Sequence, residues 1–137
     1  MAIDIRTLAT ANLVVQLMLI ALVLGAAYLA RRGRVIRHCN IVRGAFVVQI
    51  ITIFAIMLPS LLGYIASVPP IPLLYPELLI HHILGLVLIA IFIYINLEVG
   101  RVIRPVVKRK NAMWAALGVW LIALALGINI YLTVYYA

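Results

Sequence analysis

The chain has 137 residues, of which 68% are hydrophobic and 10% are charged, and its mean hydropathy is +1.26. A water-soluble domain of this size needs more polar surface than these residues supply, so the composition predicts an integral membrane protein. The net charge is +8, but the cations flank apolar stretches and no nucleic-acid-binding module is present. We therefore expect a lipid bilayer, and no nucleic acid, as the surroundings of this chain.

Four apolar stretches are long enough to cross a membrane, since a helix needs roughly twenty residues to span about 30 Å of hydrocarbon. They predict spanning helices over residues 8–30, 44–66, 78–99 and 113–135, and none of them contains Asp, Lys or Arg. The first is too long for a cleaved signal peptide, so we expect it to remain. Pro59 removes one backbone hydrogen bond from the second stretch and should kink it. Short connections between neighbouring helices favour an all-α, up-down four-helix bundle, with residues 1–137 as a single domain.

The charges predict the orientation of this bundle. Ten of the eleven cations lie within residues 31–43 and 101–110, whereas the proline-rich connection at residues 67–77, expected to be extended, has none. Because cytoplasmic loops carry the excess of Lys and Arg, both basic loops should face the cytoplasm and both termini the outside. We therefore expect a multi-pass protein of the plasma membrane. Its single cysteine, Cys39, cannot form an intramolecular disulfide.

His81 and His82 are the main candidates for chemistry, because a histidine near hydrocarbon needs a partner or a purpose. Neighbouring helical residues point about 100° apart, so the two should not grip one ion together. Three interpretations remain open: hydrogen bonding within the bundle, binding of haem or copper with Met57 as an outer-side partner, and proton transfer. His38 lies on the cytoplasmic side, about 25 to 30 Å away along the helices, which excludes a bis-histidine haem with it in one chain.

Other polar and small residues predict contacts between helices. Glu98 and Arg101 are three residues apart and can form a salt bridge on one helix, although a proton relay through Glu98 is an alternative. The patterns Ala21-x-x-x-Gly25 and Ala123-x-x-x-Gly127 would allow close helix approach. Further polar residues either hold helices together or line a polar path: Gln16, Gln49, Thr52, Ser60, Asn96 and Asn129. Aromatic residues such as Trp114 and Tyr131 are expected at the two membrane interfaces.

Three segments resemble a known family. The first is the basic turn Arg31–Asn40, which contains His38, and the second is the histidine at the head of the third span. The closing segment runs from Lys108 through Trp114, with Trp120, Gly127 and Tyr131 at helical spacing. In these segments the chain resembles the YozB-like and CtaM-like membrane proteins (domain of unknown function 420). This chain has only Lys and Arg in its final basic turn, where family members typically show a histidine.

The resemblance implies a role in the assembly of a haem-copper terminal oxidase, as proposed for CtaM-like members. No catalytic motif is present, so we expect a non-enzymatic assembly factor or accessory subunit whose partners are other membrane subunits or further copies of the chain. One alternative is a small b-type cytochrome or quinone-linked electron carrier, with haem b, or copper, held by His81 or His82 at the outer side. Another is a purely structural subunit of a larger complex.

Overall fold

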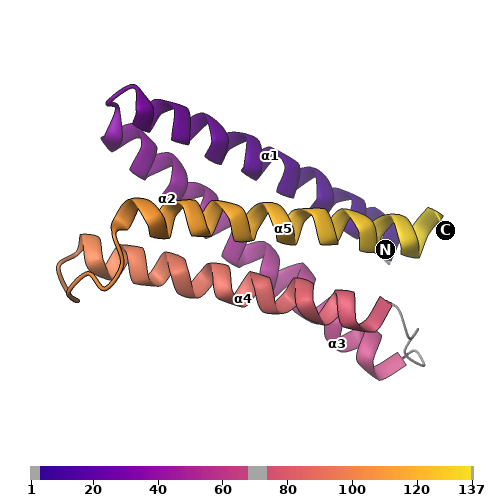
Figure 1. The fold of residues 1–137 in the computed structure, drawn as a ribbon. Coiled ribbons are helices and arrows are strands. Elements are labelled where there is room, and N and C mark those ends of the chain that lie inside the picture. Colours follow the sequence, from indigo (N-terminus) through magenta and orange to yellow (C-terminus); the bar gives the residue numbers. More distant parts are fainter. Residues whose placement is uncertain (1–3, 68–73, 137) are drawn as a thin grey trace. The chain divides into compact units, whose positions relative to one another are not determined.

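The computed structural model describes residues 4–67 and 74–136, which are helical along almost their whole length (Figure 1). Helix α1 spans Ile5–Arg31. The next helical stretch consists of α2 (Val35–Thr52), a π-helical turn η1 (Ile53–Met57) and α3 (Leu58–Ser67). The last two helices are α4 (Leu74–Val99) and α5 (Arg109–Tyr136). The described residues contain no strand.

Four helical segments are long and apolar enough to cross a membrane: Ile5–Arg31, Val35–Gly63, Leu74–Val99 and Arg109–Tyr136. The predicted all-α class with four candidate spanning helices is therefore confirmed, and a helical bundle is consistent with it. The second helical stretch begins at Val35, nine residues before the predicted start at residue 44. Hydropathy locates the apolar part of this helix but misses the basic turns that continue it, so Arg37 and Arg43 are helical residues.

Contacts within the chain divide it into two compact units, unit 1 (Met1–Pro69) and unit 2 (Pro70–Ala137). In unit 1, α1 packs against α2 and η1, and in unit 2, α4 packs against α5. The ribbon of each unit folds back on itself as an antiparallel hairpin (Figure 1). The single domain expected for residues 1–137 stays a prediction.

The connection between the units differs from its prediction. Residues 68–73 of the predicted extended segment lie outside the described residues, but residues 74–77 form the first turn of α4. Pro76 is tolerated there because the N–H groups of the first helical turn have no partner within the helix. Helix α4 therefore begins at Leu74, before the start at residue 78 that the prolines suggested, and it includes Glu77.

The π-helical turn η1 lies directly before Pro59. The N–H of Leu58 donates to the carbonyl of Ile53, five residues back, as in a π-helix. Pro59 has no N–H to donate, and its ring would crowd the carbonyl of Ala55 in a regular α-helix. A widened turn is a common way to absorb such a defect in a helix, and the kink predicted at Pro59 stays a prediction.

Both helical hairpins turn through the same C-terminal motif. In unit 1, Gly33 has a φ of 77°, and Arg34 N donates to Leu29 O at 2.9 Å. In unit 2, Arg101 has a φ of 59°, and Val102 N donates to Leu97 O at 2.9 Å. These are Schellman motifs, in which one left-handed residue lets the chain satisfy the last helical carbonyls. Each basic segment therefore begins with an ordered turn at the end of a helix.

Candidate functional site

His81 forms a hydrogen bond between the two helices of unit 2. Its Nδ1 lies 2.8 Å from the carbonyl oxygen of Ala123 on α5. Because a carbonyl oxygen only accepts, Nδ1 carries the proton, and Nε2 is left as the nitrogen that can accept a hydrogen bond or bind a metal. The side chain that sequence singled out for chemistry therefore links α4 to α5.

Gly127 provides the space for this histidine. A Cβ at position 127 would lie 3.0 Å from Cε1 and 3.5 Å from Nδ1 of His81. Gly127 and Ala123 are one helical turn apart, so the same small-residue face offers both the acceptor and the room for the ring. The Ala123-x-x-x-Gly127 pattern thus marks a close contact, but with an imidazole rather than with a second helix backbone.

The other small-residue pattern makes no such contact. Ala21 and Gly25 are exposed on α1, and a Cβ built at Gly25 would meet nothing within 4 Å. Instead, Ala26 is fully buried at 0% exposure, and Ala45 on α2 is buried as well. Within unit 1, α1 therefore makes no close approach at Ala21-x-x-x-Gly25, because its buried face runs through the adjacent residue, and an approach of another helix at this pattern stays a prediction.

His82 bonds within its own helix. Its Nδ1 lies 2.7 Å from the carbonyl oxygen of Leu78, one turn earlier. The rings of His81 and His82 have centroids 5.4 Å apart and an interplanar angle of 80°. Among the described residues, no group of three or more His, Cys, Asp or Glu is arranged to hold a metal ion.

A second polar link joins the same ends of α4 and α5. Asn129 Nδ2 donates to both carboxylate oxygens of Glu77, at 2.8 and 3.1 Å. Glu77 lies one helical turn before His81, so the two links are stacked along one face of α4. We call Glu77, His81, His82 and Asn129 the histidine cluster. The proline-rich pattern predicts Glu77 in the connection between spans, whereas its spacing of four residues from His81 is typical of one helix face.

The opposite end of unit 2 is fixed by an ion pair that the sequence assigned wrongly. Glu98 accepts hydrogen bonds from Arg109, at 2.6 Å from Nε and 2.7 Å from Nη2. The predicted partner, Arg101, lies beyond the end of α4 in the left-handed turn. Helical i, i+3 geometry therefore does not apply to it. The bidentate contact instead ties α4 to the first residue of α5.

Tyr94 orders the turn that leads to Arg109. Its hydroxyl oxygen accepts hydrogen bonds from Val106 N at 2.9 Å and Val107 N at 3.0 Å. These two amides belong to the loop between the helices, which would otherwise leave them to water. No sequence pattern predicts this contact, because it depends on how the loop folds back over α4.

His38 bridges two helices of unit 1, as His81 does in unit 2. Its Nδ1 lies 2.9 Å from the carbonyl oxygen of Ala26, so it joins α2 to α1. Met57, the proposed outer-side ligand, lies in η1 of unit 1, and its pairing with a histidine of unit 2 stays a prediction. Two of the three histidines of the chain thus bridge neighbouring helices through main-chain carbonyls.

A row of amide and hydroxyl groups lies buried in unit 1. Gln16 Nε2 donates to Thr52 Oγ1 at 3.2 Å, and the Thr52 hydroxyl donates to Gln49 O at 2.9 Å. The side-chain oxygens of Gln49 and Asn12 are buried and have no hydrogen-bond partner among residues 4–67 and 74–136. The bond between Gln16 and Thr52 links α1 to α2, as expected for polar residues between helices in a membrane.

The aromatic residues of α5 differ in exposure. Trp120 is 5% exposed, and its buried Nε1 has no hydrogen-bond partner in the part of the chain that the structure describes. Trp114 is 50% exposed, one turn from the start of α5, which suits a residue at a membrane interface. Near the other end, the ring centroid of Tyr131 lies 5.1 Å from that of Tyr135.

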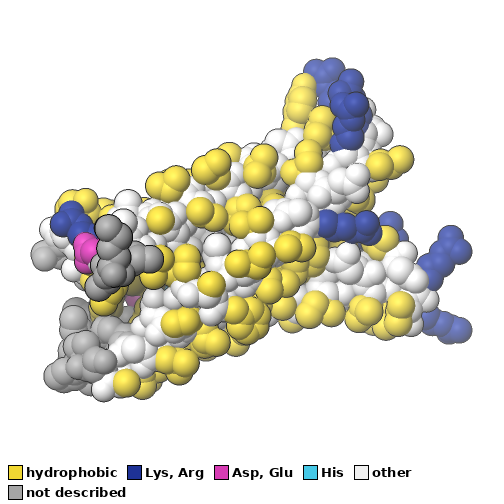
Figure 2. All heavy atoms as spheres, turned by 180° about the vertical axis from the view of Figure 1, so that it is seen from behind, with side chains coloured by type: hydrophobic (Ala, Val, Ile, Leu, Met, Phe, Trp, Pro, Cys, Tyr) yellow, Lys and Arg dark blue, Asp and Glu magenta, His cyan; other side chains and the backbone are white. Residues whose placement is uncertain are grey.

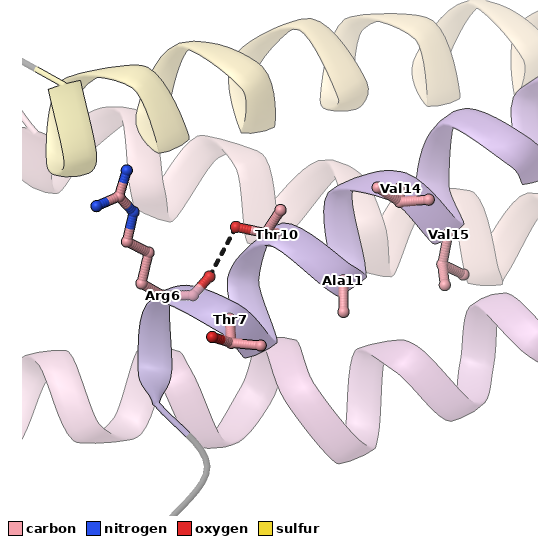
Figure 3. A pocket seen from close by; sticks show the side chains of 6 residues that line it. All are labelled: Arg6, Thr7, Thr10, Ala11, Val14 and Val15. Carbon is pink, nitrogen blue, oxygen red and sulfur yellow. Dashed lines mark hydrogen bonds between the residues drawn. The ribbon is translucent and has the colours of Figure 1, made fainter.

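The surface hollow beside the start of α1 does not involve the histidine cluster. It is lined by residues of α1 alone (Figure 3): Arg6, Thr7, Thr10, Ala11, Val14 and Val15. The hydroxyl of Thr10 donates to the carbonyl of Arg6 at 2.8 Å, so this polar group is used within the helix. Side chains from a single helix do not converge on a ligand, and we assign the hollow no site.

No protein-family model, curated protein or solved structure matches the chain. Its fold and contacts define its class: a small all-α protein with four helices able to cross a membrane. Within each unit, side-chain hydrogen bonds lock one helix to the next.

Proposed function

We propose that this chain is a non-enzymatic integral membrane protein that serves as an assembly factor or accessory subunit of a larger membrane complex. The observation that carries the proposal is the use of His38 and His81 as bridges between helices. The family resemblance supports a respiratory complex of the haem-copper oxidase type as the larger complex. In this role, the histidines keep the hairpins rigid and the protein contributes shape rather than chemistry.

The carboxylates of the chain support the same role. All three have structural partners: Asp4 accepts from Arg6 N at the start of α1, Glu77 binds Asn129, and Glu98 binds Arg109. A general acid or base has to reach a substrate proton within hydrogen-bond distance. Acids engaged at helix ends are poorly placed for such work, which favours a scaffold.

The proposed location is the plasma membrane, with residues 31–43 and 101–110 in the cytoplasm and both termini outside. The distribution of Lys and Arg supports this orientation. A labelling test on Cys39, which is partly exposed near the basic turn of unit 1, checks it. A thiol reagent that does not cross membranes should label Cys39 in inverted vesicles, and labelling in intact cells would contradict the orientation.

Co-purification tests the role directly. The tagged chain, extracted from its native membranes in mild detergent, should bring down subunits of a haem-copper oxidase, identified by mass spectrometry. Stoichiometric recovery with the active oxidase would define an accessory subunit, and recovery with immature subunits only would define an assembly factor. A chain that carries no oxidase subunit would refute the proposal.

A b-type cytochrome is the second candidate, and the tautomer of His81 favours it. Metal-binding histidines commonly donate their other ring N–H to a carbonyl, which fixes the ring, and His81 does this toward Ala123. His81 would hold a haem b through Nε2, and the haem would supply one-electron chemistry. In that case, purified protein would show a reduced-minus-oxidised b-type spectrum that disappears in His81→Ala.

A further inference from the structure

The turn of unit 1 exposes a dense group of arginines. Figure 2 shows Lys and Arg side chains gathered at this end of the hairpin. We call residues 31–43 the arginine turn. Its five cations are all exposed: Arg31, Arg32, Arg34, Arg37 and Arg43. The turn contains no acidic residue, and the three carboxylates of the chain are engaged elsewhere. The turn therefore presents a concentrated positive charge on its surface.

One of these arginines lies deeper along the hairpin than the others. Two contacts show the register of α1 against α2: His38 contacts Ala26, and Gln16 contacts Thr52. Arg43 lies between His38 and Thr52 on α2, so interpolation places it level with about Leu22 of α1. From Leu22, the apolar stretch of α1 continues for about 12 Å to Ala30, at 1.5 Å per residue. Arg43 thus lies beside a part of α1 that is apolar enough to lie within a membrane.

The surroundings of Arg43 are apolar. Leu22 is 52% exposed on α1, and Val47, one turn beyond Arg43 on α2, is 57% exposed. A charged side chain among lipid-facing residues is costly unless it reaches the interface or finds an opposite charge. Lipids are the molecules that present a phosphate directly beside acyl chains, so they match both features of this surface.

We propose that the arginine turn is a binding site for the phosphate groups of anionic phospholipids in the inner leaflet, with Arg43 as its deepest ligand. Exposed apolar side chains next to the arginines provide the contact with acyl chains, since Ile36 is 80% and Val35 is 56% exposed. At the tip, the guanidinium of Arg32 lies 5.2 Å from the ring centroid of Tyr28. Cations interleaved with apolar and aromatic groups are typical of a surface that lies in the headgroup region.

The basic turn of unit 2 provides the matched control. There, Glu98 neutralises Arg109 within the chain. Arg104 lies in the loop between α4 and α5, outside both helices, where water and headgroups reach it without entering the apolar zone. Arg104→Gln removes the same charge from the protein as Arg43→Gln does. A difference between the two variants therefore reports on position rather than on net charge.

The experiment uses the full chain purified in detergent with phosphatidylglycerol or phosphatidylcholine. Native mass spectrometry counts the lipids retained per chain, and thermal unfolding measures the stabilisation that each lipid gives, because a ligand that binds the folded state raises the unfolding midpoint. Wild-type protein should retain phosphatidylglycerol and be stabilised by it. Arg43→Gln should lose most of both effects, Arg104→Gln should keep them, and Arg43→Lys should keep a large part. Inorganic phosphate should stabilise none of these proteins.

The proposal fails if Arg43→Gln retains as much phosphatidylglycerol as the wild type, or if Arg104→Gln loses as much as Arg43→Gln. Stabilisation by inorganic phosphate would also overturn it, because the site would then bind a free anion. Unfolding in phosphatidylcholine checks that Arg43→Gln is folded. If that variant does not fold, Arg43→Lys and Arg43→Leu take its place, and equal lipid retention by these two contradicts the proposal.

Discussion

The imidazole of His81 lies against Gly127, where a Cβ would approach Cε1 to 3.0 Å, while its Nδ1 donates to Ala123 at 2.8 Å. A bulky polar side chain therefore fits between α4 and α5 because the facing residue has no side chain. This contact is one of the side-chain links between the two helices, beside those of Glu77 with Asn129 and Glu98 with Arg109. It also accounts for a histidine in an apolar helix without any cofactor.

Gly127→Ala should lower the free energy of unfolding by about 1–3 kcal/mol, because the added methyl group would displace the ring of His81. Gly118→Ala is the matched control on the same helix, since a Cβ there meets nothing within 4 Å. Alanine favours helix over glycine, so Gly118→Ala should be neutral or stabilising by up to about 1 kcal/mol. Unfolding of the purified variants in mixed micelles measures both. Equal effects at the two glycines would show that the ring does not depend on Gly127.

His81→Leu should cost more stability than His82→Leu. The first removes a hydrogen bond between helices, worth about 1 kcal/mol in a typical membrane protein, and changes a packed shape. The second removes a bond within one helix, where the carbonyl of Leu78 also belongs to the helical ladder. The same unfolding assay compares them, and a larger loss for His82→Leu would contradict the assigned roles.

The pair of Glu98 and Arg109 should behave as one unit. Glu98→Gln and Arg109→Gln should each lower the unfolding midpoint, and the double variant should lose no more than either alone, because both remove the same bidentate contact. Arg101→Gln should leave the midpoint unchanged. A loss at Arg101 equal to the loss at Glu98 would instead support the pairing that the sequence suggested.

Arg101→Gly should stabilise the protein by about 1 kcal/mol, because the φ of 59° at this position strains a residue with a Cβ. Gly33→Ala tests the same geometry in the opposite direction, since Gly33 has a φ of 77°. That variant should destabilise by about 1 kcal/mol. Opposite signs in the two unfolding experiments are expected, and a stabilising Gly33→Ala would show that the turn of unit 1 is not left-handed.

Gln49→Leu should be neutral or stabilising, because the buried side-chain oxygen of Gln49 has no hydrogen-bond donor, and an unpaired polar group in this position costs about 1–3 kcal/mol. Gln16→Leu should destabilise, since it removes the donor to Thr52. Both are read from chemical unfolding in micelles. Destabilisation by Gln49→Leu would indicate a bound water or another donor at that oxygen.

The sequence predicts the fold well because the bilayer imposes simple demands. A span needs a run of apolar residues, and the loops need charge, so hydropathy finds all four helices. It places the start of α2 at residue 44 instead of Val35, because a helix can continue through Arg37 and Arg43 after leaving the apolar zone. Local rules also predict the loss of a backbone hydrogen bond at Pro59, and η1 lies directly before this residue.

The contacts were less predictable, because they depend on which helix faces are opposed. His81 was identified as a residue in need of a partner, but only the register of α4 against α5 shows that Ala123 is that partner. The pair of Glu98 with Arg101 followed from helical spacing and failed where the helix ended. The bond between Tyr94 and the loop amides was invisible for the same reason: it depends on a turn whose path no sequence pattern specifies.

The amount of assembled haem-copper oxidase in membranes that lack this chain tests the proposed role most directly. Native gels and reduced-minus-oxidised spectra of membranes from a deletion strain measure it, with the other respiratory complexes as internal controls. We predict a strong loss of assembled oxidase, restored by the wild-type gene and by Gly118→Ala. A deletion strain with a full complement of active oxidase would contradict the role in its assembly or structure.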